Sequence, residues 1–123
     1  MIYDTHTLVH LCSSQEWQQS VHAGVHRPAS LTESGFVHLS APAQVHLPAN
    51  RLFAGRTDLL VLWLDPTRFA DEVKWEPGVP SDPASMLFPH LYGPLPLAAV
   101  VTAEPYLPGA DGVFVTPRRP GVA

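Results

Sequence analysis

Hydrophobic and polar positions alternate in several short stretches of the chain, and this pattern predicts β-strands. Alternation over residues 7–12 and 36–40 is typical of strands with one buried face. Residues 58–65 are apolar on both faces, which predicts a central strand covered on both sides. The remaining predicted elements are strands at 72–76, 98–104 and 112–116 and a short helical turn from Asp65 to Phe69.

Two helices are predicted in the N-terminal half. Ser13 and Glu16 have the spacing of a capping box, so a helix is expected to start there and to end at Gly24. A second helix is expected from about Pro42 to Phe53, followed by Gly55. Helices and strands that do not alternate regularly indicate the α+β class, with a sheet that is split in two.

Proline dominates the segment from residue 77 to residue 96. Because proline lacks an amide proton and fixes its own backbone angle, neither a helix nor a strand is expected to persist there. A loop of this length in a compact domain is more often functional than not. The segment contains six prolines: Pro77, Pro80, Pro83, Pro89, Pro94 and Pro96.

Composition narrows the class of protein. The chain has 123 residues, 46% of them hydrophobic, and a net charge of −4, which predicts one soluble domain over residues 1–116 with a flexible tail at 117–123. Only seven residues are Lys or Arg, so no DNA-binding surface is expected. The single Cys12 and the lack of a secretory signal predict a cytoplasmic protein, and no apolar run is long enough to cross a membrane.

Two histidines occupy matching places in the first two strands. His10 shares a strand face with Leu8 and Cys12, and His38 shares one with Phe36 and Ser40. Consecutive strands are often neighbours, so both imidazoles are expected on one surface. The alternative is that each is a half-buried core residue bonded to a backbone carbonyl.

Further candidate residues follow the second strand. His90 and Tyr92 point the same way if their segment is extended, and they form either part of a ligand-contacting loop or a plain surface connection. Glu76 ends the strand V-K-W-E and is either an acid-base group or an exposed carboxylate. Arg51, on the second predicted helix, either meets a phosphate or is solvated.

A series of short motifs over roughly residues 8–105 resembles the DUF952 family of small bacterial proteins. The motifs are L-V-H-L, G-F-V-H-L-S, A-N-R-L-F-A-G, D-L-L-V-L-W-L-D, V-K-W-E and F-P-H-L-Y-G-P-L, in the family's order. The family has no established activity. The resemblance implies a fold similar to that of ADP-ribosyltransferases, in which a split pair of small sheets holds NAD in a cleft.

The resemblance also implies roles for individual residues. His10 matches the histidine that holds the adenosine ribose in that fold, while His38 and Ser40 match the strand that lines the nicotinamide side. No strand-borne glutamate falls clearly in the third motif. Three residues are candidates to replace it: Glu76, Glu104 and His90.

Three functions are compatible with these residues. The first is an ADP-ribosyltransferase-like protein that binds NAD or a related nucleotide as substrate, with His38, His90 and Glu76 as catalytic residues and without a metal. Its ligand contacts would be His10, Ser40, Arg51 and the stacking ring of Tyr92. The second is a non-catalytic module that binds a nucleotide or another metabolite. The third is a zinc hydrolase with His10, His38 and His90 as ligands.

Overall fold

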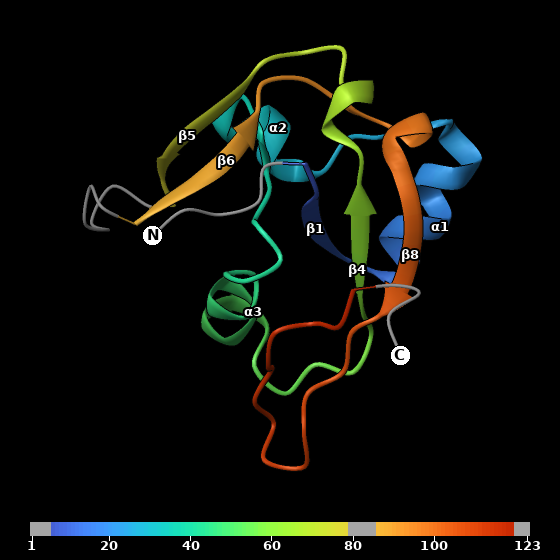
Figure 1. The fold of residues 1–123 in the computed structure, drawn as a ribbon. Helices are drawn as coiled ribbons and strands as arrows, with labels where there is room; N and C mark the ends of the chain where they lie inside the picture. Colours follow the sequence, from blue (N-terminus) through green and yellow to red (C-terminus); the bar gives the residue numbers. More distant parts are fainter. Residues whose placement is uncertain (1–5, 79–85, 120–123) are drawn as a thin grey trace.

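The chain folds into antiparallel sheets flanked by short helices (Figure 1). The computed structural model describes residues 6–78 and 86–119. The described strands form sheets in the orders β1-β4-β8, β3-β6-β5 and β2-β7. Their bounds are β1 (Leu8–Ser13), β2 (Val25–His26), β3 (Val37–His38), β4 (Leu59–Leu64), β5 (Val73–Pro77), β6 (Leu87–Leu91), β7 (Leu95–Pro96) and β8 (Val100–Pro105). The helices are α1 (Ser14–Ala23), α2 (Ala29–Ser34), α3 (His46–Phe53) and the 3₁₀ turns η1 (Pro66–Arg68) and η2 (Leu97–Ala99).

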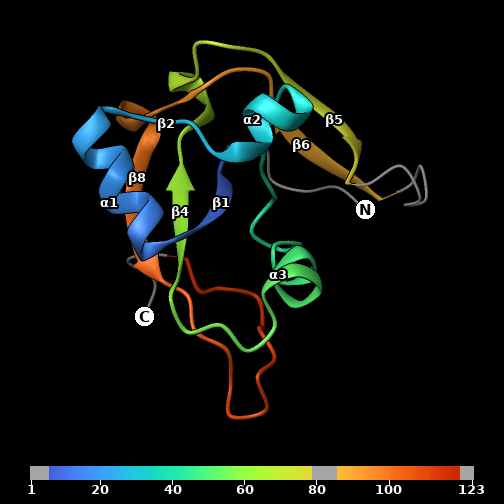
Figure 2. The ribbon, with the colours of Figure 1, turned by 180° about the vertical axis from the view of Figure 1, so that it is seen from behind.

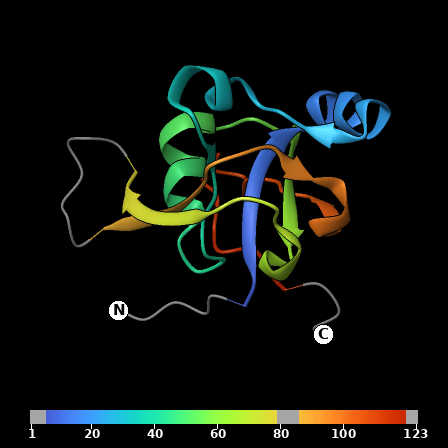
Figure 3. The ribbon, with the colours of Figure 1, turned by 90° about the horizontal axis from the view of Figure 1, so that it is seen from above.

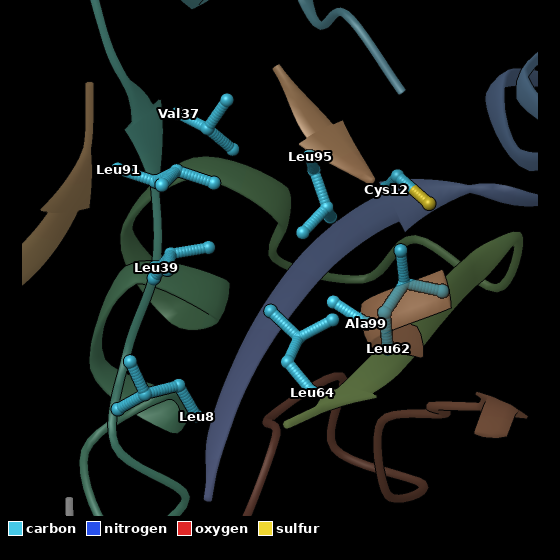
Figure 4. Packing of buried hydrophobic residues seen from close by; sticks show 9 residues of the cluster. All are labelled: Leu8, Cys12, Val37, Leu39, Leu62, Leu64, Leu91, Leu95 and Ala99. Carbon is cyan, nitrogen blue, oxygen red and sulfur yellow. The ribbon is translucent and has the colours of Figure 1, made fainter. Parts of the chain in front are cut away.

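The α+β class and the divided sheet agree with the sequence prediction. Strand β4 lies in the centre of its sheet, between β1 and β8, and its two faces contact different hydrophobic clusters. On one face, Leu62 and Leu64 pack with side chains from the second sheet (Figure 4). On the other, Val61 and Trp63 pack against α3 and the C-terminal segment. The prediction of a central strand covered on both sides is confirmed.

Helix α1 begins and ends where the capping signals predicted. The Ser13 hydroxyl accepts a hydrogen bond from the Glu16 amide at 3.0 Å, and the Glu16 carboxylate accepts one from the Ser13 amide at 2.9 Å. Gly24 follows the helix with a φ of 84°, in the left-handed region that glycine tolerates. Local sequence is sufficient to define this helix.

The segment between Gly24 and the second predicted strand contains more structure than expected. Strand β2 and helix α2 both form there, so the described part of the N-terminal half contains three α-helices, and the prediction of two was wrong. Pro28 precedes α2 with an extended backbone, and Gly35 ends it with a φ of 85°. Helix α2 has only six residues, too few to show a hydrophobic period.

The proline-rich segment is also more regular than predicted. Residues 79–85 lie outside the described residues, but β6 and β7 both fall within 77–96, so the prediction of a loop was wrong there. Pro89 is tolerated inside β6 because of the side to which it points. In a strand the nitrogen and the carbonyl of one residue point to the same side, and the Pro89 carbonyl points toward β3. There the carbonyl accepts the Leu39 amide at 3.0 Å, just beyond the end of the β3 pairing. The missing amide proton therefore removes no bond to β5.

Two other boundaries differ from the prediction. Helix α3 begins at His46 rather than near Pro42, because residues 42–45 form turns. The strand predicted at 112–116 does not form. The backbone of this segment hydrogen-bonds to a side chain instead of to another strand. Asn50 accepts a hydrogen bond from the Phe114 amide at 2.8 Å and donates one to the Phe114 carbonyl at 2.9 Å.

Helices α2 and α3 lie on the same side of β1, and α1 lies on the other side (Figures 2 and 3). Helices α2 and α3 border the region where the two large sheets meet. In the part of the chain that the structure describes, no helix is long and apolar enough to span a membrane. A cleft lies beside the point where these sheets meet.

Candidate functional site

A cleft of about 450 Å³ lies where β1 and β3 meet α2 and α3. Its polar lining includes His10, His38, Ser40 and Arg51. Most of the remaining wall is apolar and includes Leu52, Phe53 and Phe88. A hollow of this size, apolar with a few convergent polar groups, is typical of small-molecule sites.

The two large sheets meet at one point beside this cleft. Val9 of β1 and Ser40, just after β3, exchange two backbone hydrogen bonds of 2.8 and 2.9 Å. This bridge brings His10 next to β3, where its Nδ1 lies 2.6 Å from the His38 carbonyl oxygen. The two strands adjoin as expected, but His10 is buried and bonded to a backbone carbonyl, which is the alternative given for it, whereas His38 is exposed.

Both ring nitrogens of His10 already have protein partners. A carbonyl oxygen can only accept, so His10 Nδ1 donates to His38. The other nitrogen, Nε2, lies 3.0 Å from Nε2 of His26. On its far side, His26 Nδ1 lies 2.6 Å from the Ser20 hydroxyl. The buried chain Ser20–His26–His10 therefore ends on the His38 backbone.

The histidines in and beside the cleft are weaker bases than free histidine, because their pKa values are lowered. Burial, reinforced by the neighbouring His26, lowers the pKa of His10 from 6.5 to about 3. Burial also lowers the pKa of His26. The pKa of His38 is lowered by burial first, and then by the nearby His90 and Arg51. All three imidazoles are thus neutral at pH 7.

His38 is exposed as a residue, but its ring is partly covered because it packs against a neighbouring group of aromatic rings. Its centroid lies 5.3 Å from that of His90, edge to face, and 4.8 Å from that of Phe36. Phe36 in turn stacks on His90 at 4.0 Å with nearly parallel planes. His38 and His90 are paired across β3 and β6, so they share one face of the sheet. The alternation predicted for residues 36–40 holds from Phe36 to Leu39, but Ser40 is buried as well, and β3 covers Val37–His38 alone.

Glu76, His90 and Tyr92 form a second polar cluster on that face. One carboxylate oxygen of Glu76 lies 3.0 Å from His90 Nδ1 and accepts the Tyr92 hydroxyl at 2.6 Å. The other nitrogen of His90, Nε2, is buried and has no hydrogen-bond partner among the described residues. The two hydrogen bonds, led by that from Tyr92, lower the pKa of Glu76.

Replacing Tyr92 by phenylalanine is expected to raise the pKa of Glu76 toward its ordinary value, because the larger of its two stabilising hydrogen bonds is lost. The measurement is a carboxyl ¹³C NMR titration of Glu76 in the wild type and in Tyr92→Phe. Tyr106→Phe is the control, since that hydroxyl donates to the Val115 carbonyl instead. An unchanged Glu76 titration in Tyr92→Phe would show that this bond does not hold the carboxylate.

The structure divides the predicted site residues into two groups. His10, His38, Ser40 and Arg51 line the cleft. His90, Tyr92 and Glu76 are not among its described lining residues and form the adjoining cluster instead. Glu104 is on β8, across β4 from β1 in the same sheet as His10, and it is not among the described lining residues of the cleft. The sequence analysis assigned neither Ser20 nor His26 to a site, because nothing in the local pattern connects α1 and β2 to His10.

Two of the three histidines proposed as zinc ligands are hydrogen-bonded to other groups of the protein. Both nitrogens of His10 are hydrogen-bonded within the protein, and Nδ1 of His90 is held by Glu76. Within residues 6–78 and 86–119, no group of three or more His, Cys, Asp or Glu side chains is placed to hold a metal ion. A zinc site would require His10 to give up one of its buried bonds.

Comparison with known proteins gives a family and a fold. The sequence model of a family described as "Protein of unknown function (DUF952)" matches residues 11–103. The crystal structure of protein CC0527 from Caulobacter crescentus is 29% identical and has a TM-score of 0.75, with 88% of this chain and 92% of that one covered. The solution NMR structure of CC0527 has a TM-score of 0.73 at 29% identity, with 89% and 91% covered. No curated protein matches.

Proposed function

This chain belongs to the DUF952 family, and we propose that it binds a nucleotide-like metabolite carrying phosphate, such as NAD or ADP-ribose, in the cleft between β1, β3, α2 and α3. The observation that supports the proposal is the composition of the cleft wall. The Glu16 carboxylate also lines this mostly apolar hollow, but a guanidinium, two imidazoles and two hydroxyls converge on it. These are complementary to the three chemical parts of such a ligand.

Arg51 is the group suited to the phosphate. Its guanidinium offers several donors in a fixed plane, which matches phosphate oxygens better than a lysine would. Arg51 is also close enough to His38 to contribute to the lowered pKa of that imidazole, so its positive charge acts on that part of the cleft wall. Both the hydrogen-bond donors and the positive charge of Arg51 would stabilise a bound anionic ligand.

His38 and Ser40 are suited to sugar hydroxyls, because a neutral imidazole and a hydroxyl each donate and accept. His10 is less suited than the sequence suggested, since both its nitrogens are already bonded. Phe53 and Phe88 line the cleft and offer apolar rings to a flat heterocycle. They take the place that the sequence analysis gave to Tyr92.

Binding without catalysis is the better supported form of the proposal. ADP-ribosyl transfer needs a carboxylate beside the developing positive charge on the ribose. Glu76, the residue expected to supply it, is tied to His90 and Tyr92 outside the described cleft lining. Transfer of an ADP-ribosyl or phosphate group remains a second candidate, favoured by the shared sheet face on which His38 and His90 lie.

Replacing Arg51 by glutamine is expected to weaken ADP-ribose binding by about tenfold or more, because a hydrogen bond to a charged group contributes about 1.5–3 kcal/mol. Isothermal titration calorimetry with ADP-ribose and NAD measures this. Arg68→Gln is the matched control, since Arg68 bonds to the Ala98 carbonyl and pairs with Asp65. Absence of heat from the wild type at millimolar ligand would refute the proposal.

A further inference from the structure

A line of buried side chains connects helix α1 to the wall of the cleft. Ser20, His26 and His10 are exposed by 6%, 2% and 6%, so their hydrogen bonds are sheltered from water. The line begins at the Ser20 hydroxyl, runs through the two imidazoles and ends at the backbone carbonyl of His38. Two of its members, Ser20 and His26, do not line the described cleft.

The direction of every hydrogen bond in this line follows from its last member. The His38 carbonyl can only accept, so His10 carries its proton on Nδ1. A neutral His10 must then accept at Nε2, which requires His26 to donate from its own Nε2. His26 consequently accepts at Nδ1, and the Ser20 hydroxyl donates to it.

The Ser20 hydroxyl has a second possible acceptor, the Glu16 carbonyl at 3.0 Å. A hydroxyl has one proton, so it cannot fully satisfy both acceptors. The 2.6 Å contact with His26 is the shorter one, and it is the one that leaves both neutral imidazoles satisfied. If the Ser20 hydroxyl donated to the Glu16 carbonyl instead, His26 would have to donate from Nδ1 to the Ser20 oxygen. The buried histidine pair would then carry an extra proton and a positive charge.

We propose that Ser20 and His26 are positioning residues of the cleft: they fix His10 in the Nδ1-protonated form, and His10 in turn holds the His38 backbone in place. This inference rests on the proposed function for its effect on a ligand, but the protonation pattern stands independently of it. His38 lines the cleft, and His10 holds its carbonyl oxygen through a hydrogen bond. A shift of this carbonyl would move the imidazole that the ligand contacts.

The position of this bond in the fold explains why it matters. β3 is a two-residue strand, and β1 contacts its end through the single bridge between Val9 and Ser40. Few backbone bonds therefore hold this part of the cleft wall. The His10 side chain supplies an additional bond at the residue where the strand ends.

The protonation pattern is tested directly by long-range ¹H–¹⁵N NMR of the histidine rings at pH 7. We expect His10 to be protonated on Nδ1 alone and His26 on Nε2 alone. A structural packing role would not select this pair of tautomers, because free neutral histidine prefers the Nε2-protonated form. His10 protonated on Nε2, or a positive charge on either ring, would overturn the proposal.

The positioning role is tested with two substitutions at the same place. His26→Phe keeps a ring but removes the donor to His10, whereas His26→Gln retains an N–H at about the position of Nε2. The dissociation constant of ADP-ribose is expected to rise about threefold to tenfold in His26→Phe, the loss of one neutral hydrogen bond. It is expected to stay near the wild-type value in His26→Gln, and in the control His22→Phe on the exposed side of α1.

Amide hydrogen exchange gives a readout that needs no ligand. The Leu39 and Ser40 amides donate to the Pro89 and Val9 carbonyls. We expect faster exchange at both in His26→Phe and restored protection in His26→Gln. If ADP-ribose does not bind the wild type, the proposed function fails while this test still decides the positioning role. Equal exchange in folded His26→Phe and wild type would refute that role.

Discussion

The fold is expected to lose up to about 5 kcal/mol of stability between pH 6.5 and pH 3 through His10 alone. Burial lowers the pKa of this residue from 6.5 to about 3. Above pH 6.5 the side chain is neutral in both the folded and the unfolded chain, so it has no effect. As the pH falls, the unfolded chain binds a proton that the folded chain refuses, at a cost of about 1.4 kcal/mol per pH unit. The loss is complete below about pH 3.

Urea unfolding at several pH values measures this loss. His10→Asn removes the titrating group while an amide N–H can still reach the His38 carbonyl. The variant should have a lower stability at pH 7 but a much flatter decline toward pH 3. His22→Asn, at an exposed histidine, should decline as the wild type does. Parallel curves for His10→Asn and wild type would show that His10 is not the source of the acid sensitivity.

Truncating Leu62 to alanine is expected to destabilise the fold by about 3 kcal/mol, within the range of about 2–5 kcal/mol for buried leucines. Leu62 is fully buried in β4, where it pairs with His10 on one side and Ala103 on the other. It belongs to the cluster between the two large sheets (Figure 4). Since β4 is a central strand, the neighbouring backbone cannot collapse easily into the space that is left.

Chemical denaturation at pH 7 tests this expectation. The matched control is Leu107→Ala, because the Leu107 side chain is 59% exposed. Its effect should stay within about 0.5 kcal/mol, as for most surface changes. Similar losses in both variants would contradict the assignment of Leu62 to the core between the sheets.

Elements with strong local signals were predicted correctly from the sequence. The capping box of Ser13 and Glu16 satisfies amides within a single turn, so α1 needs no distant partner to begin where it does. The apolar run of β4 has only one arrangement that hides both of its faces, the centre of a covered sheet. The face on which His38 lies followed from the two-residue period of a strand.

Elements that depend on distant partners were missed. β2 has two residues and exists because β7 pairs with it. Pro89 is compatible with β6 only because its nitrogen faces β3 beyond the end of that strand's pairing, a fact of sheet geometry that no local rule contains. Conversely, the sequence around Phe114 predicts a strand, but the Phe114 backbone hydrogen-bonds to the Asn50 side chain instead of to a neighbouring strand.

The sequence by itself determined which residues carry polar chemistry in the strands, and the tertiary structure decided how they are grouped. His10, His38, Ser40 and Arg51 come together because the bridge between Val9 and Ser40 joins two sheets beside α3. Glu76 and Tyr92 belong to another cluster because β5 and β6 extend away from that bridge. His26 joins the site only through a contact with His10 across 16 residues of sequence. Periodicity fixes the face of each strand, but which faces meet depends on how the sheets pack, and that is a property of the whole chain.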